Sequence, residues 1–399
     1  MDFLERFKKY IAIDTMSDPN SETYPSSKIK ELLFADLMVQ DLKEIGIEDV
    51  ILDEYGLVYA HVPNNSEKTI ALIAHIDTAP TIKGDIKNPQ VVYGYDGGII
   101  KLNETYSLDP QEFSCLKTLL NEDLIVTDGE HLLGGDDKAG IAIIFEFAKY
   151  YLAHKDEFKF NLAICFTPDE EIGRGTIHFD LEKMKADYAF TLDGGTIYEA
   201  NYENFNAASG KLIIKGVEVH PGTAKDIMVN SILVANEFIS SLPAEMIPAK
   251  TEEYDGFIHV DSIKGSTDET VLEFIIRDHN KNLLEDKKDL IKEAVKKLTK
   301  KYPTAQLELR LHDDYRNMKE YFLKDMSLIE HLNKAYLKAK VPLKYTPIRG
   351  GTDGANITFL GLPCPNLGVG DFNAHGRFEI VSLTQMKKMV EILKEIYKI

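Results

Sequence analysis

Hydrophobic and polar positions in the first half of the chain predict strands and helices in alternation. Three nearly continuous apolar runs predict strands that are buried on both faces of a sheet: 69–76, 160–166 and 187–192. Apolar residues at helical spacing predict amphipathic helices over 26–45 and 139–153, and 48–62 reads as a hairpin that turns near Gly56. Strands that alternate with helices favour an α/β fold.

The pattern changes after about residue 207. Strands are predicted at 208–218, 257–265, 270–278 and 305–313, with helices at 229–241 and 281–301. The resulting order, β-α-β-β-α-β, is that of a ferredoxin-like unit. A helix at 328–340, a strand at 363–369 and a helix at 383–398 follow. We therefore expect one α/β domain, 1–207 and 316–399, with a second domain inserted at 208–315.

Length and charge narrow the classes of function. A chain of 399 residues is too long for a single hydrophobic core, which agrees with two domains. The net charge of −19 disfavours nucleic acid and anionic membrane surfaces as partners, although most of it is explained by a solvated acidic surface. No apolar run reaches the length of a membrane span, and the N-terminus lacks the pattern of a signal peptide. We expect a cytoplasmic protein whose three cysteines are reduced.

Acidic and histidine side chains gather where the predicted strands end. They are His75 and Asp77 at the end of the first buried strand, Glu170 and Glu171 after the second, Asp193 after the third, His375 after the strand at 363–369, and Asp136 and Asp137 in a glycine turn. Ligands of open α/β sheets bind outside the carboxyl ends of the strands. Each segment alone has a structural alternative, such as a helix cap for the Asp pair, but their convergence on one sheet edge favours a site.

Such a set of side chains suits two metal ions. Two histidines and three carboxylates can hold two Zn²⁺ ions if one carboxylate bridges them. The ions would offset the repulsion between closely set carboxylates. A further carboxylate beside the ions could act as a general base on a water molecule.

Several longer motifs resemble the peptidase T family, the tripeptide aminopeptidases among the di-zinc exopeptidases related to glutamate carboxypeptidase and aminoacylase. They are AHIDTAP (74–80), LLGGDDKAGIA (132–142), FTPDEEIGRG (166–175), TLDGG (191–195), ENFNAA (203–208), VHPGTAKDIMVNS (219–231), FIIRD (274–278) and PIRGGTDGANITFLGLPCPN (347–366). The resemblance is fainter before residue 65. It implies a mixed-sheet zinc-exopeptidase catalytic domain with an inserted lid or dimerisation-type domain, so a homodimer could form.

The resemblance also implies a role for each candidate residue. His75 and Asp193 would hold one zinc ion, Glu171 and His375 would hold the other, and Asp136 would bridge the two. Glu170 would be the general base, and Asp77 would hold the ring of His75 from behind. Asp169, the remaining acid of the same stretch, receives no chemistry and could hold the turn.

The inserted domain would contribute His220, which would stabilise the oxyanion of the tetrahedral intermediate. The substrate-binding residues implied by the resemblance are Arg277, Arg349, Asn230, Gly351 and Thr352. Local alternatives stay open: His220 could close a turn, Arg277 could form a surface ion pair, and Asn230 could cap a helix. The loop GVGDFNAHGRFEI (368–380) departs from the family pattern beside the ligand, with Ala374 before His375 and Phe378 after Arg377.

The expected activity is release of the N-terminal residue from tripeptides, through attack by a hydroxide held between the two zinc ions with Glu170 as base. Small peptides would be the substrates. One alternative keeps the chemistry and changes the substrate: a dipeptidase, a carboxypeptidase or an N-acyl amino acid hydrolase. Another is a non-catalytic peptide- or metal-binding relative, which would require a missing ligand or base; every position of that set is present.

Overall fold

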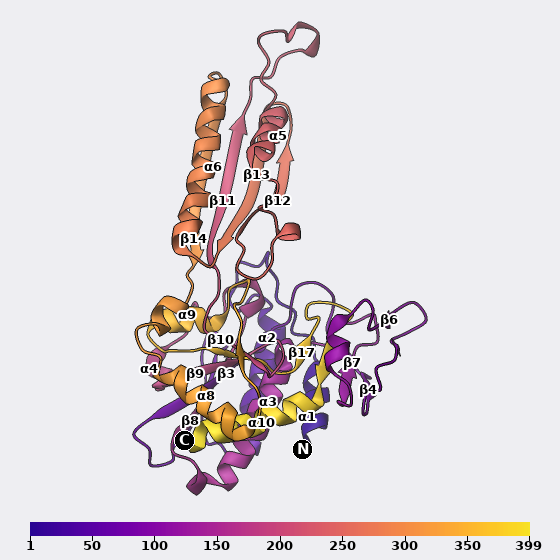
Figure 1. Ribbon diagram of the computed structural model, residues 1–399, viewed down its shortest axis with the longest axis vertical. Helices are drawn as coiled ribbons and strands as arrows, with labels where there is room; N and C mark the ends of the chain where they lie inside the picture. Colours follow the sequence, from indigo (N-terminus) through magenta and orange to yellow (C-terminus); the bar gives the residue numbers. More distant parts are fainter. The chain divides into compact units, whose positions relative to one another are not determined.

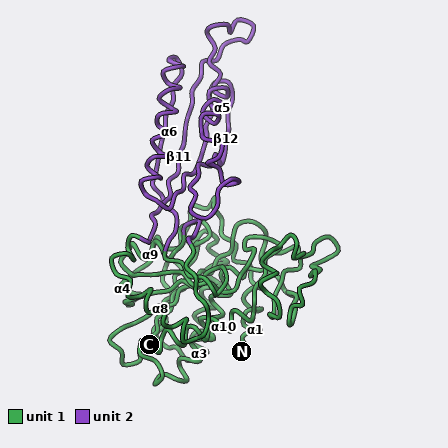
Figure 2. Tube along the Cα trace, in the orientation of Figure 1, with its two compact units in different colours: residues 1–202, 320–346, 352–399 green, residues 203–319, 347–351 purple.

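The computed structural model describes residues 1–399, which form two compact units (Figure 2). Unit 1 contains residues 1–202, 320–346 and 352–399, and unit 2 contains residues 203–319 and 347–351. The expected domain boundaries at 207/208 and 315/316 lie a few residues inside the range 203–319 of unit 2. The short segment 347–351 joins unit 2 because Ile348 pairs with Asn204 in a parallel bridge.

Unit 1 is built on a mixed sheet of eight strands. In spatial order they are β1 (Asp49–Leu52), β2 (Val58–Val62), β8 (Asn161–Thr167), β3 (Thr69–His75), β9 (Tyr188–Leu192), β16 (Asn366–Leu367), β10 (Glu199–Asn201) and β15 (Lys344–Tyr345). The central strands β8, β3 and β9 are parallel, and β1 and β2 form the predicted hairpin. The α/β class with a mixed sheet is confirmed.

Helices cover both faces of this sheet. Helix α3 (Gly135–Ala153) packs on β3 and on α10 (Leu383–Lys398), and α10 also packs on α8 (Ser327–Ala339). A second core, which includes Ile73 and Cys165, packs against residues of α4 (Leu181–Met184) and α9 (Asp353–Leu360). The remaining helices are α1 (Phe3–Ile11), α2 (Lys28–Glu44) and α7 (Lys319–Phe322). Cys165 and Cys364 are buried in this core, as expected for packing residues.

Short strands form small sheets that the apolar pattern did not predict. They are β17 (Asp371–Phe372), β18 (Ile380–Ser382), β7 (Leu124–Val126) and β4 (Gln90–Val92) in one sheet, and β5 (Ile100–Lys101) with β6 (Ser107–Leu108) in another. Runs of two or three residues are too short to show alternation. The strand expected at 363–369 is wrong in length, because only Asn366 and Leu367 pair and the prolines at 363 and 365 have no N–H to donate.

Unit 2 confirms the predicted β-α-β-β-α-β order. Its elements are β11 (Asn206–Lys215), α5 (Ser231–Ser241), β12 (Phe257–Gly265), β13 (Glu269–Asp278), α6 (Lys281–Lys301) and β14 (Gln306–Tyr315). The antiparallel sheet has the order β12-β13-β11-β14. Helices α5 and α6 run along this sheet (Figure 1) and bury Phe238, Leu272 and Ile291 in a common core.

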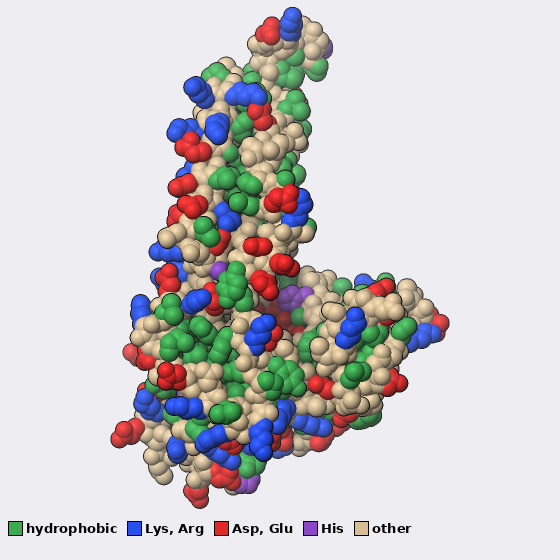
Figure 3. Space-filling model, in the orientation of Figure 1, with side chains coloured by type: hydrophobic (Ala, Val, Ile, Leu, Met, Phe, Trp, Pro, Cys, Tyr) green, Lys and Arg blue, Asp and Glu red, His purple; other side chains and the backbone are tan.

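Charged side chains of both signs lie on the surface of the two units. On the face drawn in Figure 3, Asp and Glu side chains are interspersed with Lys and Arg on both units. None of the helices combines the length and the apolar character that a membrane span needs.

Candidate metal centre

Parallel strands bring the candidate site residues to one edge of the unit 1 sheet. Strand β3 ends at His75, which is in register with Thr167 at the end of β8. The 3₁₀ turn η3 (Glu170–Ile172) follows β8, and Asp193 follows β9 directly. Because β3 lies between β8 and β9, these polar side chains meet at the carboxyl ends of three adjacent strands.

The carboxylate of Asp136 lies between two imidazoles. Its Oδ1 is 2.8 Å from Nε2 of His75, and its Oδ2 is 3.1 Å from Nε2 of His375. Asp193 Oδ1 is 3.8 Å from the same nitrogen of His75, and Glu171 Oε2 is 3.0 Å from that of His375. The five residues therefore form two halves, one around each histidine, which share a single carboxylate.

The chemistry of this donor set fits divalent cations. His75, Asp136 and Glu171 present ligand atoms within 4.8 Å of one another, and Glu171 Oε1 is buried without a hydrogen-bond partner. Burial raises the pKa values of Asp193 and Glu171, while the two histidines lower that of Asp136 despite its burial. A cluster of buried carboxylates is stabilised when a cation neutralises its negative charge. Imidazole and carboxylate groups together are a donor set typical of zinc.

Asp137 lies beside the cluster, but its oxygens already have partners. Its Oδ2 accepts a hydrogen bond from the backbone N–H of His75 at 3.2 Å, and its Oδ1 accepts from Gly140 N–H at 3.1 Å. A Cβ atom at Gly140 would overlap the carbonyl oxygen of Leu192, so glycine allows α3 to approach the end of β9. Asp137 thus fixes the start of α3, and Asp136 is the carboxylate that faces both histidines.

Asp77 connects the histidine strand with the acidic turn. Its buried carboxylate accepts hydrogen bonds from the backbone N–H groups of Glu170 at 2.9 Å and Glu171 at 3.1 Å. His75 Nδ1 lies 3.1 Å from the Asp77 carbonyl oxygen and 3.4 Å from its Oδ1. One residue therefore orients the ring of His75, with Nε2 toward Asp136, and holds the turn that carries both glutamates.

The three acids of the turn have three different environments. Glu171 contacts His375, whereas burial raises the pKa of the Glu170 carboxyl well above its usual value, more than the nearby His75 lowers it. Asp169 has a positive φ of 57°, and its Oδ2 accepts from the Ser26 backbone N–H at 2.8 Å. Asp169 was expected to hold the turn, and its carboxylate instead bonds a backbone amide of the distant Ser26 segment.

Several buried acids around the centre were missed by sequence reasoning, Glu31 and Asp353 among them. Glu31 on α2 accepts hydrogen bonds from the backbone N–H groups of Asp169 and Ser27, and burial raises its pKa to about 9. Asp353 accepts from the Thr167 hydroxyl at 2.9 Å, and burial raises its pKa to about 7. Asp353 stands in the motif GTDGA, so the family resemblance held a signal for it, while Glu31 carried none.

The candidate residues in unit 2 each have a local partner. His220 is exposed, and its Nδ1 accepts a hydrogen bond from the Gly222 N–H at 3.1 Å, as in a closed turn. Arg277 donates to the carbonyl oxygens of Ala208 and Ile276, both at 3.0 Å. Asn230 caps α5 by accepting from the Ile232 N–H. The bonds of His220 and Asn230 match their structural alternatives, and Arg277 Nη1 also lies 3.5 Å from Asp314 Oδ2, as in the ion-pair alternative. The His220 Nε2 atom has no partner inside the turn.

The candidate residues of the segment 349–352 also contact neighbouring groups of the protein. Arg349 donates to the carbonyl oxygens of Glu253 at 2.8 Å and Asp255 at 2.9 Å, and its guanidinium lies 5.1 Å from the ring centre of Phe205. Gly351 lies beside the ring of Tyr315 in unit 2, and Thr352 caps α9 in unit 1. Their contact with substrate stays a prediction.

The loop that departs from the family pattern is packed. Phe378 lies 4.8 Å from the ring centre of Phe113 and 5.8 Å from that of Tyr106. Phe113 and Phe378 pack against the hydrophobic core of the small sheets. The aromatic residue after Arg377 therefore holds the loop in place, and His375 takes a positive φ of 65° within it.

Comparison with known proteins identifies the family. A model of the peptidase dimerisation domain matches residues 202–305, and a model of the M42 glutamyl aminopeptidases matches residues 118–239. Peptidase T of Clostridium perfringens (strain 13 / Type A) is 46% identical over 398 residues, which cover 99% of this chain and 98% of that protein. The chain belongs to the peptidase T family.

Other members of the peptidase T family and solved structures agree. Peptidase T of Geobacillus kaustophilus is 44% identical over 403 residues, covering 100% of this chain and 98% of that protein. The crystal structure of the aminopeptidase PepT from Bacillus cereus has a TM-score of 0.77 at 21% identity, with 99% of this chain and 97% of that chain covered. A tripeptidase from Staphylococcus aureus also has a TM-score of 0.77, at 20% identity and the same coverage. The fold is thus that of the family's catalytic domain with its inserted domain.

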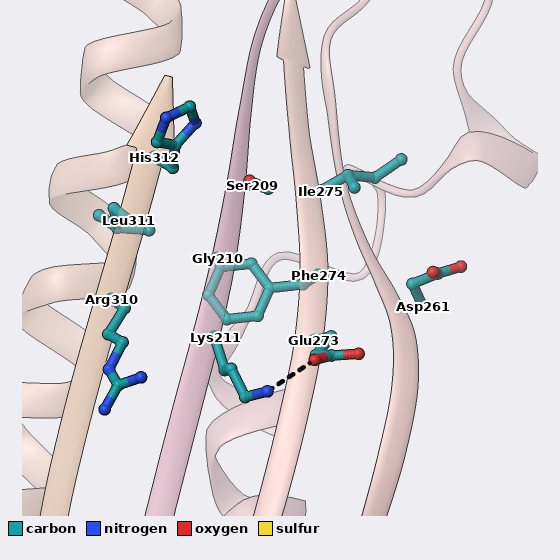
Figure 4. Close-up of a pocket in the computed structure, with 10 residues that line it drawn as sticks. All are labelled: Ser209, Gly210, Lys211, Asp261, Glu273, Phe274, Ile275, Arg310, Leu311 and His312. Atoms are coloured by element: carbon teal, nitrogen blue, oxygen red, sulfur yellow. Dashed lines mark hydrogen bonds and ion pairs between the residues drawn. The ribbon is translucent and has the colours of Figure 1, made fainter. Parts of the chain in front are cut away.

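A separate hollow lies on the open face of the unit 2 sheet (Figure 4) and has a volume of about 460 Å³. It is lined by Ser209, Gly210, Lys211, Asp261, Glu273, Phe274, Ile275, Arg310, Leu311 and His312. Lys211 and Glu273 are paired at 2.9 Å, and Arg310 pairs with Glu308 at 2.7 Å. Since Lys211, Glu273 and Arg310 are all engaged in ion pairs, the metal centre of unit 1 is the better candidate for catalysis.

Proposed function

We propose that this member of the peptidase T family is a metal-dependent aminopeptidase that releases the N-terminal residue from tripeptides. The observation that carries the proposal is the Asp136 carboxylate, whose two oxygens face His75 and His375 separately. The relatives named peptidase T and the solved tripeptidase support the substrate class.

His75 and Asp193 would hold one Zn²⁺ ion, Glu171 and His375 would hold a second, and Asp136 would be shared. The contacts of these side chains with one another support this assignment, because each donor atom lies within 4 Å of a donor from another segment. When bound, such ions act as Lewis acids that lower the pKa of water and polarise a peptide carbonyl.

The chain's own residues would then transfer the proton and hold the general base in position. Glu170 would take the proton of the attacking water and pass it to the leaving amine. Burial raises the pKa of the Glu170 carboxyl, which makes its carboxylate a stronger base than a solvent-exposed one and suits it to take up the proton. Asp77 would keep Glu170 in place through the backbone of the turn.

Unit 2 would contribute to substrate binding. We propose that His220 donates from Nε2 to the oxyanion, since its Nδ1 is occupied by the Gly222 N–H. Arg277, Arg349, Asn230, Gly351 and Thr352 are proposed to lie along the bound peptide. The match to a peptidase dimerisation domain supports a homodimer, in which His220 would serve its own subunit or the neighbouring one.

A peptide panel tests the proposed substrate class. The protein is incubated with Zn²⁺ and with di-, tri- and tetrapeptides of the same first residue, each with a free and an acetylated amine. We expect tripeptides to be cleaved fastest at the first bond and acetylated peptides to resist. Equal or faster cleavage of dipeptides would contradict the tripeptide assignment, and cleavage of the acetyl group would indicate an N-acyl amino acid hydrolase.

A further inference from the structure

Glu379 is a buried acid with a defined position between two metal-ligand segments. Only 1% of its surface is exposed, and it follows His375 by four residues. Its Oε2 accepts a hydrogen bond from the backbone N–H of Gly134 at 2.8 Å, and its Oε1 accepts from the backbone N–H of Asp136 at 3.2 Å. One side chain from the His375 segment thus holds the backbone of the turn that presents Asp136.

Glu379 is itself fixed at the start of a strand. Strand β18 begins at Ile380 and pairs with both β7 and β17. The residue before Glu379, Phe378, packs against the rings of Tyr106 and Phe113. The carboxylate therefore projects from a rigid support, and a mobile loop does not carry it.

The backbone of residues 134–136 packs closely against Glu379 and strand β18. A Cβ atom at Gly135 would overlap the Val381 side chain, and it would lie 2.7 Å from Asp371 Oδ1 and 3.1 Å from Glu379 Oε1. Glycine at this position lets the backbone of 134–136 reach the carboxylate. Such close packing restricts the position of the Asp136 Cα atom, from which the carboxylate projects.

We infer that Glu379 is a positioning residue that couples the His375 segment to the Asp136 turn and so sets the spacing of the shared carboxylate and its histidine partner. The inference rests on the proposed two-ion centre and deepens it. Glu379 does not contact the side chain of either ligand in this role; it acts through the backbone.

The chemistry explains why a carboxylate is needed here. Two N–H donors converge on one side chain, and a carboxylate offers an acceptor oxygen to each, with the added strength of a charged acceptor. Glutamine has the same shape but only one acceptor, so its NH₂ group would face a backbone N–H. Aspartate keeps both acceptors but is one methylene shorter.

Metal binding tests the inference without relying on turnover. Wild-type protein, Glu379→Gln, Glu379→Asp and the control Glu391→Gln are freed of metal and titrated with Zn²⁺ against a chromophoric chelator. Glu391 is an exposed glutamate of α10, so its replacement controls for the loss of one charge. The same proteins are titrated with Co²⁺, whose visible spectrum reports ligand geometry. Circular dichroism of the metal-free proteins checks folding.

We expect Glu379→Gln to lower Zn²⁺ affinity by about 10–100-fold and to alter the Co²⁺ spectrum, as for other groups that orient metal ligands. Glu379→Asp should lie between Gln and wild type, and Glu391→Gln should match wild type. Wild-type affinity and an unchanged Co²⁺ spectrum in Glu379→Gln would overturn the inference while leaving the two-ion centre intact. If Glu379→Gln does not fold, Glu379→Asp takes its place: wild-type Zn²⁺ affinity and an unchanged Co²⁺ spectrum in that variant would overturn the inference. Fewer than two ions in the wild type would instead refute the centre itself.

Discussion

Asp136 and His375 lie 239 residues apart in the chain, yet the Oδ2 atom of one is 3.1 Å from the Nε2 atom of the other. The first turn of α3 carries Asp136, and a loop between the short strands β17 and β18 carries His375. The opposite oxygen of the same carboxylate contacts His75. Chain segments from three parts of the sequence thus meet at one side chain, which is the arrangement that two cations sharing a ligand require.

Single glutamine substitutions should separate the two glutamates of the turn. Glu170→Gln is expected to keep its zinc and to lower kcat by about 10²–10⁴-fold, because it removes the proton acceptor without removing a ligand. Glu171→Gln should lose zinc, because it removes a carboxylate that contacts His375. Zinc content by atomic absorption and tripeptide turnover are measured on both. Near-wild-type turnover of Glu170→Gln would show that Glu170 is not the base.

Asp77→Asn should weaken the site although Asp77 is no ligand. The carboxylate accepts from two backbone N–H groups, and asparagine can serve only one of them. We expect zinc affinity or activity to fall by about 10–100-fold, measured by chelator competition and tripeptide turnover. If both values stay at wild-type level, the turn is held by other contacts.

Asp169→Asn should affect stability and not chemistry. Asp169 ties the turn to the Ser26 segment and lies 3.3 Å from Arg174. Weakening these contacts should cost about 1–3 kcal/mol of unfolding free energy, measured by urea denaturation, with zinc stoichiometry and the pH profile of kcat unchanged. A large loss of kcat without a change in stability would assign chemistry to Asp169 after all.

Zinc uptake should release protons. In the metal-free protein, hydrogen bonds with Asp136 and Glu171 raise the pKa of His375 to about 11. Burial lowers the pKa of His75, but the carboxylates of Asp136, Asp77 and Asp193 together outweigh burial and raise that pKa well above its usual value. Both rings bind metal only when neutral, so zinc must displace their protons, and zinc affinity should fall as the pH is lowered. Calorimetric titrations at neutral pH in buffers of different ionisation enthalpy count the protons. No proton release would argue against the two histidines as ligands.

The sequence was informative where structure follows from long apolar patterns. The run at 69–76 predicted β3 and placed His75 at a strand end, and helix 281–301 matches α6. Helix α2 was also predicted, but its buried face was not: Ile29 and Leu33 are 77% and 63% exposed, whereas Glu31 is buried. The spacing of apolar residues along the sequence cannot reveal a buried acid that bonds distant backbone amides. Glu379 was missed for the same reason.

The most direct test of the shared-carboxylate centre is tripeptide hydrolysis measured while Zn²⁺ is added stepwise to the metal-free protein. The proposed function predicts that activity rises until two equivalents are bound per chain and then levels off. Full activity at one equivalent, or no tripeptide hydrolysis at two, would contradict it.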